Sequence, residues 1–264
     1  MAKFKLGYIG MGNMGAALAR ASCAHNAREV VVANRTPAKA DAFAQQTNCA
    51  VGTMEFVARE SSYVIIGTLP GAVGEVVRRI YPAMKEAGEK RVLVSMAGGV
   101  SLADLAGMTD EAFPIIRIMP NTPVAVGKGL TFFAPNANVD EVTIADFMKA
   151  MAPTGSLDAL PETLFNAGSA VSGCGPAFVA LFIDALADGG VKAGLPRAKA
   201  ISFAEKMILG TAALALETGK HPGQLKDEVA SPGGSTIEGI QALEESGFRA
   251  ATIRAVVAAW EKHK

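Results

Sequence analysis

Hydrophobic residues in the first half of the chain fall into short runs that alternate with longer amphipathic stretches. Five aliphatic runs predict strands at residues 5–10, 29–34, 63–68, 91–96 and 113–119. Helical spacing between these runs predicts helices at residues 14–25, 37–46 and 73–87. Short apolar runs alternating with helices are typical of βαβ units built around a buried parallel sheet.

The pattern changes at about residue 160, where the strand-like runs stop. Before that point, residues 129–135 predict one more strand and residues 140–151 a helix. The later helices are expected at 175–192, 196–218, 235–246 and 248–262. We therefore expect an α/β protein, with a Rossmann-type doubly wound parallel sheet in residues 1–160 and an all-α domain in residues 161–264.

Some of the later helices are apolar around most of their circumference, as residues 202–217 illustrate. Such a helix must be buried on several sides, and about 100 residues form only a thin bundle. A subunit interface explains this apolar surface better than a self-contained core, which is the alternative.

Composition narrows the class of protein further. Half of the 264 residues are hydrophobic and 19% are charged, which predicts a globular chain. Lys and Arg balance Asp and Glu at 25 each, so charge gives no support for nucleic-acid or membrane binding. Cys23, Cys49 and Cys174 are widely spaced, which fits a reduced protein without a disulfide framework or metal site.

No segment of the sequence predicts a membrane anchor or a leader. The most apolar run, residues 177–183, ends at Asp184 and is far shorter than the roughly 20 residues that span a bilayer. The N-terminus passes directly into the first predicted strand and has no cleavage site. We expect a soluble, cytoplasmic protein.

Three glycines directly after the first predicted strand are the first sign of a ligand site. Gly10, Gly12 and Gly15 form a G-x-G-x-x-G pattern between that strand and a helix. In this setting the backbone N–H groups at the helix N-terminus can bind the pyrophosphate of a dinucleotide. The pattern alone is weak, but the strand–helix alternation around it favours a dinucleotide site over a turn without ligand.

The residues after the second predicted strand bear on which dinucleotide binds. NAD-binding chains usually have a carboxylate there, whereas this chain has Asn34, Arg35 and Thr36. Arg35 could pair with the 2′-phosphate of NADP, and its two neighbours could donate hydrogen bonds to that phosphate. The alternative is that Arg35 is a solvated surface residue. We expect NADPH as the cofactor, with NADH a weaker one.

Three further segments follow predicted strands at the edge of the sheet where ligands bind, at residues 68–73, 95–105 and 117–129. In the second segment, Ala97 and Gly98 would let the backbone approach a flat ring, and Ser101 can cap the next helix. In the third segment, two flanking prolines fix the backbone around Asn121. A stiff turn explains this last feature equally well.

Groups suited to acid–base catalysis are scarce in this sequence. No metal-ligand spacing, Ser-His-Asp order or nucleophile elbow is present, and none of the three histidines lies in a catalytic motif. An alcohol or ketone substrate would need a general acid. A protonated imine would not, because its carbon is already electrophilic, so the scarcity favours reduction of a C=N bond.

Residues 231–236, Ser-Pro-Gly-Gly-Ser-Thr, are typical of a small anion site. An S-x-x-E pattern from Ser235 to Glu238 predicts a capping box with Ser235 as the N-cap. Gly233 and Gly234 leave backbone N–H groups uncovered, which together with two hydroxyls would suit a substrate carboxylate. A helix that is merely well capped is the alternative.

Taken together, these segments resemble the pyrroline-5-carboxylate reductase family over nearly the whole chain. The most specific stretch is residues 228–256, supported by residues 96–101, 117–129, 171–197 and 221–227. The resemblance implies NAD(P)H-dependent reduction of 1-pyrroline-5-carboxylate to L-proline, the last step of proline biosynthesis. It also implies a Rossmann domain and a helical domain that intertwines with its twin in dimers, which often assemble into decamers.

The resemblance extends to individual site residues, with Thr236 as the catalytic residue and no metal. The substrate-binding residues that it implies are Glu162, Ser231, Gly233, Gly234, Ser235 and Thr236. The cofactor-binding residues, from the glycine pattern and the resemblance together, are Ile9, Gly10, Met11, Gly12, Asn13, Met14, Gly15, Asn34, Arg35, Thr36, Thr68, Leu69, Pro70, Met96, Ala97, Gly98 and Asn121.

The chain departs from the family pattern at three positions. Leu69 replaces the lysine of a common V-K-P motif, Met54 replaces an asparagine, and Cys174 replaces a serine. These changes bear on affinity and on which imine is accepted, so a reductase of a related cyclic imine is an alternative.

Two other classes share part of the pattern. A β-hydroxyacid dehydrogenase would have a similar N-terminal domain but needs a catalytic lysine in a G-x-x-x-K-x-x-N-type helix. None of the later lysines has that setting, namely Lys192, Lys199, Lys206, Lys220 and Lys226. A non-catalytic NADP-binding protein would have no use for an anion site opposite the cofactor.

Overall fold

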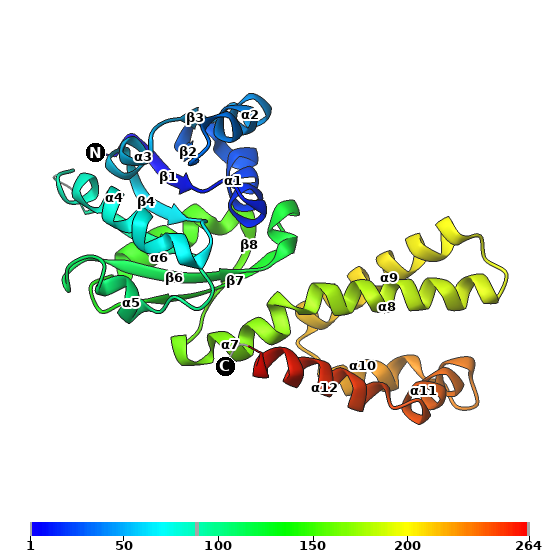
Figure 1. The fold of residues 1–264 in the computed structure, drawn as a ribbon. Helices are drawn as coiled ribbons and strands as arrows, with labels where there is room; N and C mark the ends of the chain where they lie inside the picture. The colour runs from blue at the N-terminus through cyan, green and yellow to red at the C-terminus, as the bar shows by residue number, and fades with distance from the viewer. Residues whose placement is uncertain (1, 88–89, 263–264) are drawn as a thin grey trace. The chain divides into compact units, whose positions relative to one another are not determined.

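The structure is a computed structural model that describes residues 2–87 and 90–262 (Figure 1). The chain divides into two compact units, the first ending at Gly173 and the second beginning at Cys174. The boundary expected from the sequence lies between residues 160 and 161. The last strand ends at Ala159, and a 3-10 turn and a short helix, α7 (Phe165–Gly168), follow it within the first unit.

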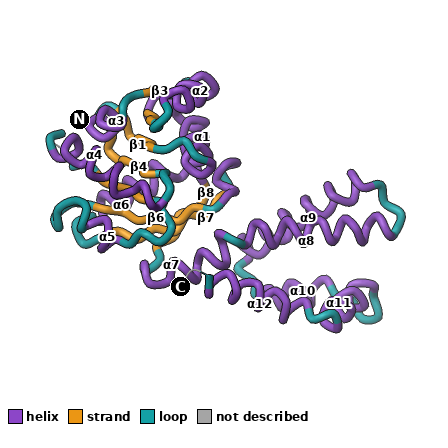
Figure 2. The backbone as a smooth tube through the Cα atoms, viewed as in Figure 1, coloured by secondary structure: helices purple, strands orange, loops and turns teal. Residues whose placement is uncertain are grey.

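Among the described residues, eight strands form a single sheet in the first unit, in the order β3-β2-β1-β4-β5-β6-β7-β8 (Figure 2). The strands are β1 (Phe4–Ile9), β2 (Val30–Ala33), β3 (Ala50–Val51), β4 (Ser61–Ile66), β5 (Val92–Ser95), β6 (Ile115–Pro120), β7 (Gly129–Pro135) and β8 (Gly155–Ala159). Neighbouring strands are parallel except β6 and β7, which are antiparallel. The predicted α/β class and Rossmann-type sheet are confirmed.

Helices cover both faces of this sheet. One face packs against α1 (Asn13–Asn26), α2 (Pro37–Thr47) and α6 (Glu141–Met151). The other packs against α3 (Met54–Glu60), α4 (Val73–Lys85) and α5 (Leu102–Ala106). The central strands are apolar at successive positions, so both faces are buried, as parallel sheets require.

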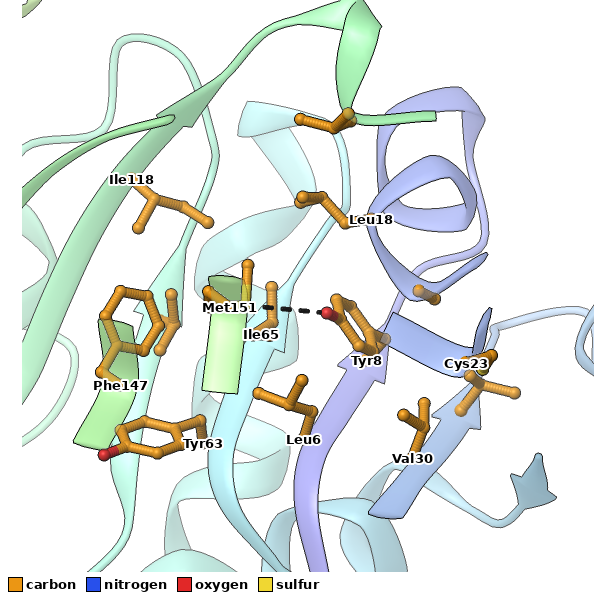
Figure 3. Packing of buried hydrophobic residues seen from close by; sticks show 14 of the residues in the cluster. Leu6, Tyr8, Leu18, Cys23, Val30, Tyr63, Ile65, Ile118, Phe147 and Met151 are labelled. Carbon is orange, nitrogen blue, oxygen red and sulfur yellow. Dashed lines mark hydrogen bonds between the residues drawn. The ribbon is translucent and has the colours of Figure 1, made fainter. Parts of the chain in front are cut away.

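The core beneath α1 and α6 contains large side chains that meet at the middle of the sheet (Figure 3). Tyr8 is almost completely buried there, and its hydroxyl lies 2.7 Å from the Ser22 hydroxyl and 3.8 Å from the Met151 sulfur. Phe147 packs against Tyr63 with ring centroids 5.3 Å apart. This core fixes β1, and with it the turn that follows β1.

The second unit consists of helices α8 (Gly175–Lys192), α9 (Arg197–Thr218), α10 (Pro222–Val229), α11 (Ser235–Glu245) and α12 (Phe248–Glu261). All four helices predicted for this region are confirmed, and α10 was not predicted. Among its described residues, the buried hydrophobic ones are only Ala187, Ala200, Ala204 and Leu225. Many large apolar side chains are exposed instead, including Leu209 at 68% and Leu216 at 85%.

One helical stretch, Glu162–Lys192, is long and apolar enough by length and composition alone to cross a membrane. The mean hydropathy of its most apolar 18-residue window is 1.7, and 11% of that window is buried. The stretch is longer than the run at residues 177–183 because α7 and a π-helical turn (Ser169–Gly173) lead directly into α8. A single such helix is weak support for a membrane span, because an exposed subunit interface has the same composition.

Candidate active site

The loops that follow β1, β2, β4 and β5 are joined at the carboxyl edge of the sheet. The Gly10 N–H donates to the Ala33 carbonyl at 2.9 Å, and the Gly67 N–H donates to the Ile9 carbonyl at 2.8 Å. Met96 donates in the same way to the last residue of β4 at 3.3 Å. The edge therefore brings together segments far apart in the sequence that are expected to bind the cofactor.

Two glycines of the G-x-G-x-x-G turn have a steric reason, and the third is a helix cap. Gly10 has φ +107°, and a Cβ there would lie 2.8 Å from the Gly67 carbonyl group. A Cβ on Gly15 would collide with the Gly10 carbonyl oxygen. Gly12 is the N-cap of α1, and no described side chain caps this helix. The first amide N–H groups of α1 are thus available for an anion, as the pyrophosphate of a dinucleotide requires.

Asn34 connects two of these loops. Its Oδ1 accepts a hydrogen bond from the Met11 N–H at 2.9 Å, and its Nδ2 donates to the Thr36 carbonyl at 3.0 Å. Arg35 is exposed and forms no ion pair with the described residues. Arg35 is consequently the cation at the end of β2 that remains available to a ligand.

The loop after β4 presents a polar group without a partner. The Thr68 hydroxyl is buried and makes no hydrogen bond with any described residue. Buried hydroxyls are nearly always paired, so this one has capacity for a ligand atom. The neighbouring Leu69 is 81% exposed, whereas the Met54 side chain packs into the core and is 7% exposed. The glycine turn and Thr68 together fit a bound dinucleotide.

The loop after β5 leads into α5, whose predicted cap is confirmed. The Ser101 hydroxyl accepts from the Asp104 N–H at 3.0 Å, and the Asp104 carboxylate accepts from the Ser101 N–H at 2.8 Å. The Ser101 hydroxyl also donates to the Asp104 carboxylate at 2.6 Å, and this bond, followed by the one from the Ser101 N–H, lowers the pKa of the Asp104 carboxyl below its ordinary value. Between Ala97 and this cap, Gly98 and Gly99 are exposed, and a Cβ on either would meet nothing within 4 Å.

Asn121 lies directly after β6 and is 9% exposed. Its Nδ2 donates to the Ser172 carbonyl at 3.1 Å, and its Oδ1 accepts from the Leu130 N–H at 2.9 Å. Both ends of the side-chain amide are therefore engaged within the first unit. The side chain therefore holds the turn, and the Asn121 carbonyl also accepts from the Val124 N–H at 3.2 Å.

Sequence reasoning missed Arg117, which lies in β6 and is 6% exposed. Its Nη1 donates to Glu162 Oε1 at 2.7 Å, and its guanidinium carbon lies 4.9 Å from the Phe165 ring centroid. The same Glu162 oxygen accepts from the Leu102 N–H at 2.7 Å. The sequence does contain a signal for this residue, a single arginine within an apolar strand. A buried cation needs a partner, so its position predicts a nearby carboxylate.

The Ser-Pro-Gly-Gly-Ser-Thr turn lies in the second unit. The predicted capping box is wrong: Gly234 is the N-cap of α11, and no described side chain caps this helix. Gly233 has φ +69°, and the Gly234 N–H donates to the Ser231 carbonyl at 3.0 Å, so the N-cap lies one residue earlier than the S-x-x-E pattern predicted. Ser235 is therefore already the first helical residue, and its hydroxyl is not at the capping position.

The two histidines that the structure describes lie at helix ends. His221 caps α10, where its Nδ1 accepts from the Gly223 N–H at 3.0 Å. His25 lies in the last turn of α1, and His263 lies outside the described residues. Across the described parts of the chain, no group of three or more His, Cys, Asp or Glu side chains could hold a metal ion.

Comparisons with known proteins extend over both units. Residues 162–264 match the model of the family described as pyrroline-5-carboxylate reductase dimerisation. Residues 5–99 match the model described as NADP oxidoreductase, coenzyme F420-dependent. The curated pyrroline-5-carboxylate reductase of Escherichia coli strain K12 is 39% identical over 263 residues, which is 98% of this chain and 96% of that protein.

Two solved structures have the same fold over nearly their full length. The pyrroline carboxylate reductase of Plasmodium falciparum with NADP bound has a TM-score of 0.86 and 30% identity, covering 100% of this chain and 98% of that one. The pyrroline-5-carboxylate reductase of Coxiella burnetii has a TM-score of 0.90 and 28% identity, covering 99% and 97%. The matches include the helical unit as well as the nucleotide-binding sheet. An NAD(P)-binding domain is thus followed by a helical dimerisation domain, and the chain belongs to the pyrroline-5-carboxylate reductase family.

Proposed function

We propose that this protein is an NADPH-dependent reductase that converts 1-pyrroline-5-carboxylate to L-proline, the last step of proline biosynthesis. The observation behind the proposal is that this member of the family has two glycine turns that each lead into a helix without a side-chain cap. One turn is the glycine turn at α1 and the other is the turn before α11. The first suits the pyrophosphate of a dinucleotide, and the second suits the carboxylate of a small substrate.

The cofactor proposed here is NADPH, which supplies the hydride when it is bound. The N–H groups of Gly12 and Asn13 would hold the pyrophosphate, and Arg35 the 2′-phosphate, since it is an unpaired cation at the end of β2. Thr68 and the loop from Met96 to Gly98 would border the nicotinamide end. NADH lacks the phosphate that Arg35 would bind, so we expect it to be the weaker cofactor.

The substrate carboxylate is proposed to bind at residues 231–236. Thr236, the catalytic residue in this proposal, would donate its hydroxyl to the substrate, while the Ser235 hydroxyl and the Gly233 amide complete the anion site. The Gly234 N–H already donates to the Ser231 carbonyl, so Gly234 contributes by leaving the turn uncovered by a side chain. With Gly234 as the N-cap, the hydroxyls of Ser235 and Thr236 do not cap α11. The Glu162 carboxylate already accepts hydrogen bonds from the Leu102 N–H and from Arg117. The proposal for substrate binding therefore rests on residues 231–236.

The working form is proposed to be a dimer built through the helical unit. The apolar stretch Glu162–Lys192 falls inside the segment that matches the dimerisation family, which accounts for its exposed side chains without a membrane. Assembly of dimers into decamers and a cytoplasmic location belong to the same proposal. Sedimentation of the purified protein tests the assembly.

One assay separates the proposed function from its rivals. The purified protein is expected to oxidise NADPH when 1-pyrroline-5-carboxylate is added and to produce proline. A panel of 3-hydroxy acids with NADP⁺ tests the β-hydroxyacid dehydrogenase, and other cyclic imines test the related reductase. A protein that binds NADPH but turns over none of these substrates would be a non-catalytic binder, which would refute the proposal.

A further inference from the structure

The loop between β5 and α5 is held firmly at both ends, although its middle is free. At its start, the buried Ser95 hydroxyl accepts from the Ala97 N–H at 3.3 Å. In its middle, Gly98 and Gly99 are exposed, and Gly99 has φ +74°. Two successive glycines allow many backbone conformations, so the conformation of this loop depends on its anchored ends.

The far end of the loop is anchored by a long-range carboxylate. Leu102 is the first residue of α5, and its N–H has no partner within the helix. Glu162 Oε1, 60 residues away in the sequence, accepts a hydrogen bond from this N–H at 2.7 Å. Together with the Ser101–Asp104 box, this bond fixes where α5 begins and therefore where the loop ends.

Arg117 fixes the position of that carboxylate. Its Nη1 donates to the same Glu162 oxygen at 2.7 Å, and its guanidinium packs over the ring of Phe165. Arg117 also pairs with Ser95 in the register of β5 and β6, so it lies beside the start of the loop. The arginine side chain is 7% exposed and that of Glu162 is 26% exposed, so water weakens this ion pair less than it would at the surface.

We infer that Glu162 and Arg117 are positioning residues that hold the loop from Met96 to Ser101 in the conformation that accepts the nicotinamide end of NADPH. The inference rests on the proposed function for the identity of the cofactor. It assigns neither residue a contact with the substrate. The carboxylate acts through the Leu102 N–H, and the guanidinium acts through the carboxylate.

The test measures binding without turnover, using NADPH and the fragment adenosine 2′,5′-bisphosphate, which lacks the nicotinamide. Glu162→Ala removes the acceptor for the Leu102 N–H, and Glu162→Gln keeps one acceptor oxygen. Glu141→Ala is the matched control, because Glu141 is an exposed first residue of a helix on the same unit. Arg117→Lys keeps the charge but loses the planar guanidinium over Phe165.

Glu162→Ala should raise the Kd for NADPH about 10-fold, and Glu162→Gln should raise it less. The Kd for the bisphosphate fragment should stay within about twofold in every variant, as should both Kd values for Glu141→Ala. The melting temperatures of the two Glu162 variants should equal that of the wild type, which shows that they are folded. The test then stands on these variants even if Arg117→Lys folds poorly.

Two results would overturn the inference. The first is an equal loss of affinity for NADPH and for the fragment, which would indicate a general structural defect. The second is an unchanged Kd for NADPH together with a raised KM for 1-pyrroline-5-carboxylate, which would make Glu162 a substrate ligand. Because binding is measured without substrate, failure of the proposed reaction would appear separately, as wild-type protein that binds NADPH without reducing the imine.

Discussion

Two arginines in the first unit have opposite surroundings and therefore different uses. Arg117 is buried in β6 with a carboxylate and an aromatic ring as partners. Arg35 follows β2, is exposed, and forms no ion pair with residues that the structure describes. A guanidinium without an internal partner breaks no bond within the protein when it binds a phosphate, whereas a buried, paired one would leave its carboxylate unpaired.

Replacement of Arg35 tests the choice of cofactor. Arg35→Ala should raise the KM for NADPH about 10-fold, since it removes a charge-assisted hydrogen bond to the 2′-phosphate. The KM for NADH should change by less than about twofold. Lys39→Ala is the control, because Lys39 is an exposed cation in the adjoining helix α2. A wild-type enzyme that used NADH as well as NADPH would contradict the role of Arg35.

Replacement of Thr236 tests the substrate site. Thr236→Val keeps the shape of the side chain but removes its hydroxyl, and should lower kcat/KM for 1-pyrroline-5-carboxylate about 10- to 150-fold. The loss should be the same with either nicotinamide cofactor, and Thr236→Ser should recover much of the activity. The carboxyl-free imine 1-pyrroline should be reduced almost equally by both proteins. Full activity of a folded Thr236→Val enzyme would exclude the proposed contact.

At the scale of elements, the turn before α11 depends on two glycines for different reasons. Gly233 has φ +69°, a conformation that costs other residues about 1 kcal/mol or more. Gly234 has φ −83°, which any residue can adopt, but a Cβ there would meet the Ser231 hydroxyl and lie 3.2 Å from its carbonyl oxygen. The first glycine is needed for backbone conformation and the second for space.

These two glycines predict distinct mutant behaviour. Gly233→Ala should lower the free energy of unfolding by about 1 kcal/mol, as seen in thermal or urea denaturation. Gly234→Ala should leave the backbone unstrained but displace Ser231, and so lower kcat/KM with little change in melting temperature. If Gly234→Ala retained wild-type activity, the uncovered backbone at this turn would have no role in binding.

Much of the fold was predictable because its signals are local. The aliphatic runs gave six strands within a few residues, and Gly10, Gly12 and Gly15 gave the first turn. The two strands that were missed are the two-residue β3 and β8, whose sequence GSLDA has no apolar run. Neither has the pattern that burial imposes on a central strand.

The parts of the site that could not be predicted depend on distance in the sequence or on exact geometry. The bond between Arg117 and Glu162 joins residues 45 apart, and no spacing rule connects them. The capping box at Ser235 is wrong because the turn at Gly233 makes Gly234 the N-cap, one residue before the predicted one. A motif indicates that a helix begins nearby, but the backbone of the preceding turn decides which residue is the cap.

At the scale of the whole molecule, the second unit buries little apolar surface within itself. Its buried hydrophobic residues among those described are three alanines and Leu225, whereas Leu209 and other large side chains are exposed. A helical unit of this composition needs a partner to cover its apolar side chains. The match to a dimerisation family agrees with this reading of the burial.

A charge placed on α9 should therefore weaken self-association. Leu209→Asp should shift the protein from dimer toward monomer in sedimentation at micromolar concentration, because a buried, unpaired carboxylate is costly. Val142→Asp is the matched control, since Val142 is 78% exposed on α6 in the other unit. A wild-type protein that sedimented as a stable 27.2 kDa monomer would contradict the assignment of the apolar helices.

Because the core of the second unit is small, the amount of folded enzyme should depend on the concentration of the chain. If each helical unit is completed only by its twin, folding is partly bimolecular, and stability depends on how much chain is present. A tenfold dilution then lowers the stability of the dimer by about 1.4 kcal/mol. The melting temperature should fall on dilution. In a cell that makes little of this chain, the amount of folded enzyme should fall more steeply than the amount of chain made.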